Sequence, residues 1–261
     1  MKRAPVLAVS EARGIRRLHL GGEAIQSAMR IDDPYALALD YTRCMMAVLL
    51  FHPQPREVLM IGLGGGSLAK FFHHRFRAAR MRAVELDARV VAAARTHFAL
   101  PPDDARLKVE IGDGAEALAP ECCDLLLVDG FDDGEQVPAL TSRAFYDTAW
   151  LALCAPGAMV LNFMSDDPRL ELYLKRLENA FGGSVLCLPA LADPNLIVLA
   201  LKGGPGRIAW RALRERAERL ERRFALPFRR YVAALRQMNP HTGDDLIIIP
   251  DTNAKSNGAE R

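Results

Sequence analysis

A glycine-rich turn is the first feature of the sequence that could do chemistry. An apolar run, Val58–Ile61, leads into four closely spaced glycines and then into a helical pattern; the glycines are Gly62, Gly64, Gly65 and Gly66. Glycine lets a backbone approach a bound ligand closely, and the helix behind the turn presents its N-terminus to that ligand. Tight packing between a strand and a helix would require the same glycines, so the turn alone leaves both interpretations open.

An acidic residue after the second apolar run favours a bound nucleoside. Glu85 closes this run and follows Gly62 at close to the spacing of about 20 residues expected of an acid that hydrogen-bonds ribose hydroxyls. Asp113 and Gly114 follow the third run, where an acid can accept a hydrogen bond from an adenine amino group, although a simple turn would also explain Asp113. The glycine turn and Glu85 together predict a nucleoside cofactor.

Further carboxylates follow the fourth apolar run. Asp129 closes Leu125–Val128, and Asp132 and Asp133 come soon after it. Carboxylates that gather at one cleft repel one another, so such a cleft favours cationic ligands. The sequence therefore predicts a cation-binding region beside the nucleoside.

The elements that position these residues follow a regular alternation. Helical patterns separate apolar runs of strand length, until a last pair of runs that lie close enough to form a hairpin. This alternation predicts a doubly wound, seven-stranded and mostly parallel α/β sheet, Rossmann-like and of the class I methyltransferase type, with its last strand reversed. The expected strands are 57–62, 81–86, 107–111, 124–129, 158–163, 184–188 and 195–201, and the expected helices are 67–76, 88–98, 142–154 and 167–181.

Two smaller regions flank the sheet. Residues 6–30 predict a small antiparallel β meander, and residues 34–50 predict a helix that links it to the sheet. Residues 207–236 carry ten arginines and three glutamates, with apolar residues at helical spacing, which predicts an amphipathic helix docked on the sheet with a solvated arginine face. An RNA- or phosphate-binding surface is the alternative there. The expected divisions are 1–50 (meander and linking helix), 51–204 (nucleoside-binding transferase domain), 205–240 (arginine-rich helices) and 241–261 (tail).

The overall composition is that of an ordinary globular protein. Hydrophobic residues make up 50% of the chain, charged residues 25%, and the formal net charge is only +2, which argues against a surface devoted to nucleic acid or anionic lipid. The five cysteines are scattered without metal-site spacing, so we expect reduced core thiols and no bound metal. Without a signal peptide or a membrane-spanning run, the expected location is the cytoplasm.

The order of these motifs resembles that of the polyamine aminopropyltransferases, which are the spermidine and spermine synthases, over roughly residues 15–202. The resemblance implies that the glycine turn, Glu85 and Asp113 bind the nucleoside of decarboxylated S-adenosylmethionine, as does Gln26 in the N-terminal hairpin. It also implies that Tyr41 faces a polyamine. The segments that carry it are His52–Gly62, Glu85-Leu86-Asp87, Asp113-Gly114, and a D-x-x-D pair formed by Asp129 and Asp132.

The resemblance implies transfer of an aminopropyl group to an amine or polyamine. A free alkylamine has a pKa of about 10.4, like Lys, so it needs a base to remove a proton before it can attack. Asp129 is the expected base, and Asp132 with Tyr41 is expected to hold and orient the amine. The resemblance further implies a homodimer, in which the meander pairs with its copy.

Several positions depart from this family pattern. Gly65 stands where active relatives carry an Asp that receives the aminopropyl ammonium, Asn162 stands where they carry Gln, and a late tyrosine is absent from Pro189–Asn195. These departures indicate the spermidine-synthase-like branch and leave two alternatives open. One is a methyltransferase that uses S-adenosylmethionine itself, because Gly65 removes a carboxylate that would repel that cofactor's own carboxylate. The other is a nucleoside-binding homologue without catalytic activity.

Overall fold

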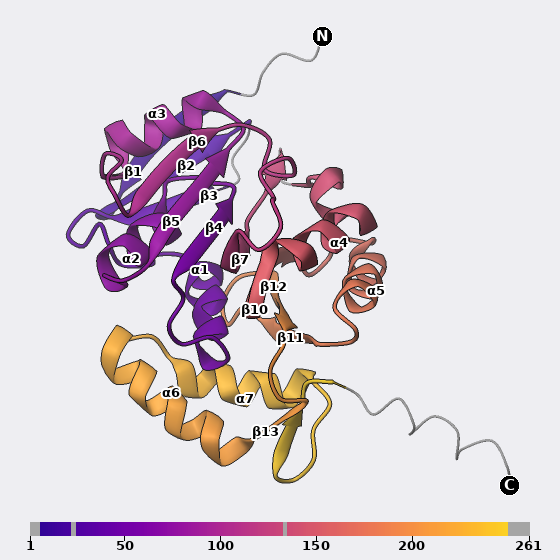
Figure 1. The fold of residues 1–261 in the computed structure, drawn as a ribbon. Helices are drawn as coiled ribbons and strands as arrows, with labels where there is room; N and C mark the ends of the chain where they lie inside the picture. Colours follow the sequence, from indigo (N-terminus) through magenta and orange to yellow (C-terminus); the bar gives the residue numbers. More distant parts are fainter. Residues whose placement is uncertain (1–5, 22–24, 133–134, 250–261) are drawn as a thin grey trace, which may run out of the picture.

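One seven-stranded sheet forms the centre of the molecule (Figure 1). The computed structural model describes residues 6–21, 25–132 and 135–249. In spatial order the strands are β11 (Val185–Pro189), β12 (Asn195–Lys202), β10 (Leu153–Met164), β7 (Cys123–Val128), β4 (Glu57–Ile61), β5 (Arg80–Glu85) and β6 (Leu107–Ile111). β12 runs antiparallel to both of its neighbours and the other pairs are parallel, which confirms the predicted sheet with its reversed strand.

Alternate side chains of the central strands pack into two separate hydrophobic cores. Along β4, Val58 and Met60 belong to one buried cluster, whereas Leu59 and Ile61 belong to the other. Successive side chains of a strand point to opposite faces, so the two clusters lie on the two faces of the sheet. One face is covered partly by α2 (Ser67–Arg75), and the other by α4 (Arg143–Ala152) and α5 (Leu170–Ala180). These helices and α3 (Ala88–His97) confirm the four predicted for the alternating region.

The N-terminal segment forms the predicted antiparallel meander. Its strands are β1 (Leu7–Ala12), β2 (Ile15–Leu20) and β3 (Ile25–Arg30), in that spatial order. Leu18 and Met29 pack with Val90 and Phe98 of the α3 region in a third buried cluster. The meander is therefore anchored beside the helix that follows Glu85.

The linking helix is shorter than the sequence predicts. Only α1 (Asp40–Met45) is α-helical, a 3-10 turn follows at Met46–Leu50, and residues 34–39 are not helical. The 3-10 turn is buried throughout, and Leu37 is buried ahead of α1. The apolar residues of this segment thus reflect burial among several neighbours, rather than one face of a continuous helix.

The arginine-rich segment forms two helices, α6 (Trp210–Phe224) and α7 (Phe228–Met238), which lie together at one end of the molecule in Figure 1. The predicted apolar face of α6 is buried; it consists of Trp210, Leu213, Ala217, Leu220 and Phe224. Within the region expected as the tail, β14 (Asp245–Ile247) pairs with β13 (Arg207–Ala209), and Leu246 is buried. The expected division of the chain into four regions stays a prediction, since α6 and α7 share a buried cluster with the sheet.

Two further observations concern the cysteines and the helices. Cys44, Cys122, Cys123, Cys154 and Cys187 are all free thiols, and Cys44 and Cys123 are buried. Within the described ranges, no helix has the length and apolar character needed to cross a membrane.

Candidate active site

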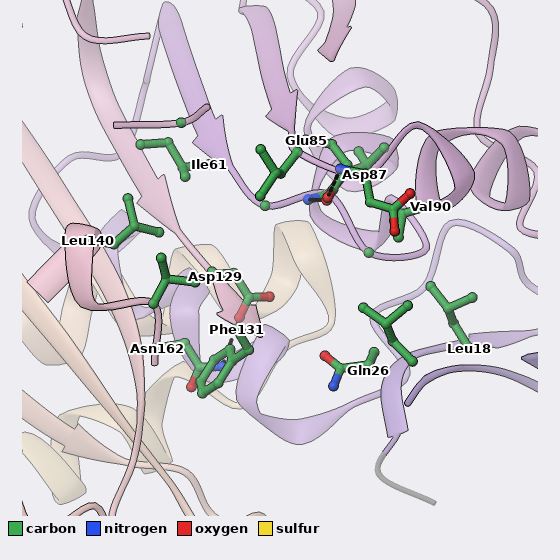
Figure 2. Close-up of a pocket in the computed structure, with 18 of the residues that line it drawn as sticks. Leu18, Gln26, Ile61, Glu85, Asp87, Val90, Asp129, Phe131, Leu140 and Asn162 are labelled. Carbon is green, nitrogen blue, oxygen red and sulfur yellow. Dashed lines mark hydrogen bonds between the residues drawn. The ribbon is translucent and has the colours of Figure 1, made fainter. Parts of the chain in front are cut away.

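A cavity of about 680 Å³ opens where the parallel strands β4, β5, β6 and β7 end. Its size is within the range of about 300–1,000 Å³ that is usual for small-molecule sites. Figure 2 shows Glu85, Asp87 and Val90 on one side of it and Asp129, Phe131 and Asn162 on another. Of the residues predicted from sequence, those that line this cavity are Gln26, Tyr41, Gly62, Gly64, Glu85, Asp113, Gly114 and Asp129.

Gly62 is the residue of the glycine turn that packs against the backbone of Asp129, just after β7. Its φ of +85° is in the left-handed region, and a Cβ at this position would overlap the backbone carbonyl oxygen of Asp129. The Asp129 N–H in turn donates to the carbonyl of Ile61 at 2.9 Å. Only glycine therefore allows the turn to pass this close to Asp129.

Gly65 and Gly66 are not among the residues that line the cavity, and their predicted contact with a cofactor stays a prediction. A Cβ on Gly65 would lie 2.8 Å from Ser27 Oγ and 2.9 Å from Phe98 Cδ1, so this residue faces the meander and the end of α3. Gly66 precedes α2 and faces Leu100. The first half of the turn thus faces the cavity, and the second half packs the turn against its supports.

Glu85 fastens the turn as well as lining the cavity. Its Oε2 accepts a hydrogen bond from the Leu63 N–H at 2.8 Å, and its Oε1 accepts one from the Asp87 N–H at 3.0 Å. The two hydrogen bonds thus hold the Glu85 carboxylate against the backbone of the turn. The spare acceptor capacity of both oxygens remains suited to hydroxyl groups of a ligand.

Asp87 lines the cavity. It belongs to one of the segments that carry the family resemblance, but no role was predicted for it. Its carboxylate caps α3 by accepting from the Arg89 N–H at 2.8 Å, and it also pairs with the Arg89 guanidinium. The hydrogen bond from Arg89 lowers the pKa of Asp87. Both residues line the cavity, so this pair forms part of its polar wall.

Asp113 takes part in a turn and also lines the cavity. Its Oδ1 accepts from the Ala115 N–H at 2.8 Å, as the simple-turn interpretation requires. A Cβ on the neighbouring Gly114 would overlap Ile61 Cγ2, so glycine is needed for packing there. The turn leaves the Asp113 side chain at the cavity wall, where its predicted contact with adenine stays a prediction.

Two side chains hold the Asp129 carboxylate. Tyr41 donates its phenolic O–H to Asp129 Oδ2 at 3.0 Å. The Asn162 side chain donates to Asp129 Oδ1 at 2.9 Å, and Figure 2 shows these two residues beside each other. Loss of surrounding water raises the pKa of Asp129, while these two hydrogen bonds act in the opposite direction. Burial and the neighbouring Asp129 charge raise the pKa of Tyr41 well above its usual value, so the phenol stays a donor.

A second asparagine fixes the orientation of Asn162. The Asn195 side chain donates to Asn162 Oδ1 at 2.9 Å, which directs the Asn162 amide N–H₂ toward Asp129. Asn162 is 4% exposed. The chain of contacts from Asn195 through Asn162 thus holds the Asp129 carboxylate in place. Asp132 was predicted to bind the amine, but its side chain lies outside the described residues.

Asp193 and Asn195 line the cavity although sequence reasoning assigned them no role there. Parallel strands end at the edge that binds ligands, so acids were sought only after such strands. β12 is reversed, and therefore it begins at this same edge. Both side chains could have been predicted from the expected reversal of this strand, because Asp193 precedes its first residue and Asn195 is that residue.

The sequence matches a family model described as the spermine/spermidine synthase domain over residues 39–185. A polyamine aminopropyltransferase of Chromobacterium violaceum is 41% identical over 94% of each chain. Among solved structures, a probable spermidine synthase from Corynebacterium glutamicum superposes with a TM-score of 0.70 at 19% identity, covering 92% of this chain and 94% of that one. Human methyltransferase-like protein 13, solved with S-adenosylhomocysteine (SAH), gives 0.63 at 24% identity, covering 84% and 99%. The two structures show a shared fold.

Proposed function

Because the chain belongs to the spermine/spermidine synthase family, we propose that it is an enzyme that transfers an aminopropyl group from decarboxylated S-adenosylmethionine to an amine acceptor. The name of the Chromobacterium relative supports this reaction class. The observation that carries the proposal is Asp129, a carboxylate with a raised pKa that two donors hold at the wall of a large acidic cavity.

The charge of the cavity suits this chemistry. Five acidic residues are among the described residues that line it, namely Glu85, Asp87, Asp113, Asp129 and Asp193, and Arg89, the basic member of the same set, pairs with Asp87. Excess negative charge favours cationic ligands, and both a sulfonium nucleoside and an ammonium are cations. Glu85 and Asp113 would hold the nucleoside through its ribose and adenine, with Gln26, Gly62 and Gly64 beside it.

Asp129 would act as the general base. It removes one proton from the acceptor ammonium, and the nitrogen lone pair then attacks the methylene carbon next to the sulfonium sulfur. A carbon–nitrogen bond forms while the carbon–sulfur bond breaks, and methylthioadenosine leaves as a neutral thioether. Tyr41 and Asn162 keep the carboxylate oriented for this step. We retain Asp132 as a proposed partner of the amine on the family pattern.

We expect methylthioadenosine to form when the protein is incubated with decarboxylated S-adenosylmethionine and a diamine. Mass spectrometry identifies the nucleoside, and omission of the amine is the control, since transfer needs an acceptor. Parallel incubations with S-adenosylmethionine test the second candidate, methyl transfer, which would yield SAH. That candidate draws support from Gly65, where a side chain would meet Ser27 and Phe98, so no carboxylate of the turn faces the cofactor. Absence of both products with every amine tried would contradict catalysis and favour a binding protein.

Removal of the Tyr41 hydroxyl is expected to shift the acid side of the pH–rate profile upward. The Tyr41 O–H lowers the pKa of Asp129 by stabilising its ionised form, so Tyr41→Phe raises that pKa. A hydrogen bond to a charged group contributes about 1.5–3 kcal/mol, which corresponds to a shift of about 1–2 pH units. The measurement is kcat/KM against pH. Tyr35→Phe, at a residue that does not line the cavity, is the matched control, and an unshifted acid side in Tyr41→Phe would contradict Asp129 as the base.

We also propose that the protein is a cytoplasmic homodimer. The meander is small, and β1 is an edge strand with most of its side chains exposed, so pairing with a second copy would cover it.

A further inference from the structure

The loop between β11 and β12 brings a carboxylate into the cavity that the proposed reaction has not used. Asp193 is half-buried and lines the same cavity as Asp129. Among the residues that the structure describes, no Lys, Arg or His side chain forms an ion pair with it. Among the described residues, the Asp193 carboxylate thus has no cationic side chain as a partner.

Two reciprocal hydrogen bonds hold this loop against the start of α1. Asp193 Oδ2 accepts from the Tyr41 backbone N–H at 3.0 Å, and Asp40 Oδ2 accepts from the Ala192 backbone N–H at 2.7 Å. Asp40 is 7% exposed and also pairs with Arg43. Each segment thus provides a carboxylate that accepts a hydrogen bond from a backbone N–H of the other segment. These two bonds fix the position of Asp193 relative to Tyr41.

Tyr41 connects Asp193 to the proposed base. Its backbone N–H contacts Asp193, while its phenolic O–H contacts Asp129. The two carboxylates therefore lie at opposite ends of one tyrosine residue, along the wall of one cavity. A ligand with two cationic groups separated by an apolar chain matches this arrangement, because each carboxylate can bind one ammonium.

We propose that Asp193 binds the far ammonium of a diamine acceptor while the near nitrogen lies at Asp129. Asp193 would then be a specificity-determining residue that favours diamines over monoamines of the same carbon chain. This inference rests on the proposed function, because it assigns a substrate contact within the same site. It also gives a role to the segment from which the family's late tyrosine is missing.

The test compares butane-1,4-diamine with butylamine as acceptors for the wild-type protein and Asp193→Asn. Asparagine keeps an oxygen that can accept from the Tyr41 N–H but removes the charge. We expect kcat/KM for the diamine to fall by about 10–100-fold, mainly through KM, and kcat/KM for butylamine to change less than twofold. Asp166→Asn is the control, because Asp166 is an exposed acid at the start of the β10–α5 connection and does not line the cavity.

Calorimetric titration of butane-1,4-diamine into protein saturated with methylthioadenosine separates this inference from the proposed function. Weaker diamine binding to Asp193→Asn than to wild type, with equal melting temperatures, supports the inference even if turnover is undetectable. Equal diamine affinity of the two proteins overturns the role of Asp193 while leaving the proposed function intact. Failure of the wild type to bind the diamine also overturns the inference, whereas the proposed function is tested separately by the formation of methylthioadenosine with other amines. An equal loss of kcat/KM for diamine and monoamine would identify Asp193 as a structural residue and overturn its role in specificity.

Discussion

Asp129→Asn is expected to lower turnover by about 10²–10⁴-fold, because it removes the general base and leaves its shape almost unchanged. The amide introduced by this substitution can still accept from Asn162 and donate to the Tyr41 oxygen, so the surrounding contacts survive. Single-turnover formation of methylthioadenosine, measured with saturating diamine, reports the chemical step directly. Affinity for methylthioadenosine should remain within a few fold of wild type, because Glu85 and Asp113 supply the proposed nucleoside contacts.

Stability at neutral pH provides the folding control for this variant. The folded-state pKa of Asp129 is raised, so folded protein holds this proton more tightly than unfolded protein does. Protonated Asp129 therefore contributes most to the free energy of unfolding at low pH, and this contribution is lost as pH rises through the raised pKa. Removing the charge should leave the melting temperature at pH 7 equal to or above that of wild type. Asp113→Asn, a carboxylate of the same cavity, should change the KM of the nucleoside rather than the chemical step. Undiminished turnover in Asp129→Asn would show that another group removes the proton.

The sheet could be predicted from the sequence because its signals are local. Each strand is an apolar run of the right length, and the alternation with helical patterns implies parallel order without any knowledge of distant contacts. The same rule brought Glu85, Asp113 and Asp129 to one edge, since the ends of neighbouring parallel strands meet. Their common cavity is thus a consequence of topology.

Sequence patterns carry less information where the direction of a side chain depends on tertiary packing. Four glycines in one turn look equivalent in sequence, but Gly65 and Gly66 face Phe98 and Leu100 rather than the cavity. Likewise, nothing local shows that Leu246 pairs its strand with a segment before α6. Such contacts join residues far apart in the chain, where the spacing of residue types carries no signal.

The network around Asp129 shows a further limit of sequence reasoning. Tyr41 and Asn162 each had a sequence signal, but the role of Asn195 depends on the orientation of a neighbouring amide. An amide can present either its oxygen or its nitrogen, and the choice follows from its partners. Asn195 supplies the donor that fixes Asn162, so the geometry of the proposed base is set one residue further away than the family pattern indicates.

Glu85→Ala is expected to remove most of the stabilisation that a bound nucleoside gives the protein. A ligand at 100 times its Kd adds about 2.7 kcal/mol to the free energy of unfolding. Wild-type protein should therefore melt at a higher temperature with methylthioadenosine or SAH, measured by differential scanning fluorimetry. The variant loses the proposed ribose contact, and it also leaves the Leu63 and Asp87 N–H groups without their acceptor.

Loss of the acceptor for the Leu63 and Asp87 N–H groups could itself disturb the turn, so a second variant must keep an acceptor there. Glu85→Gln retains one carbonyl oxygen for a backbone donor, so its ligand-free melting temperature should lie nearer to wild type than that of Glu85→Ala. Glu110→Ala removes an exposed acid of β6 that pairs with Arg82, and it should keep the full ligand-induced shift. If Glu85→Ala folds and retains that shift, Glu85 supports the turn without binding the nucleoside. If wild-type protein shows no shift with either nucleoside at millimolar concentration, the cavity does not bind an adenosine thioether.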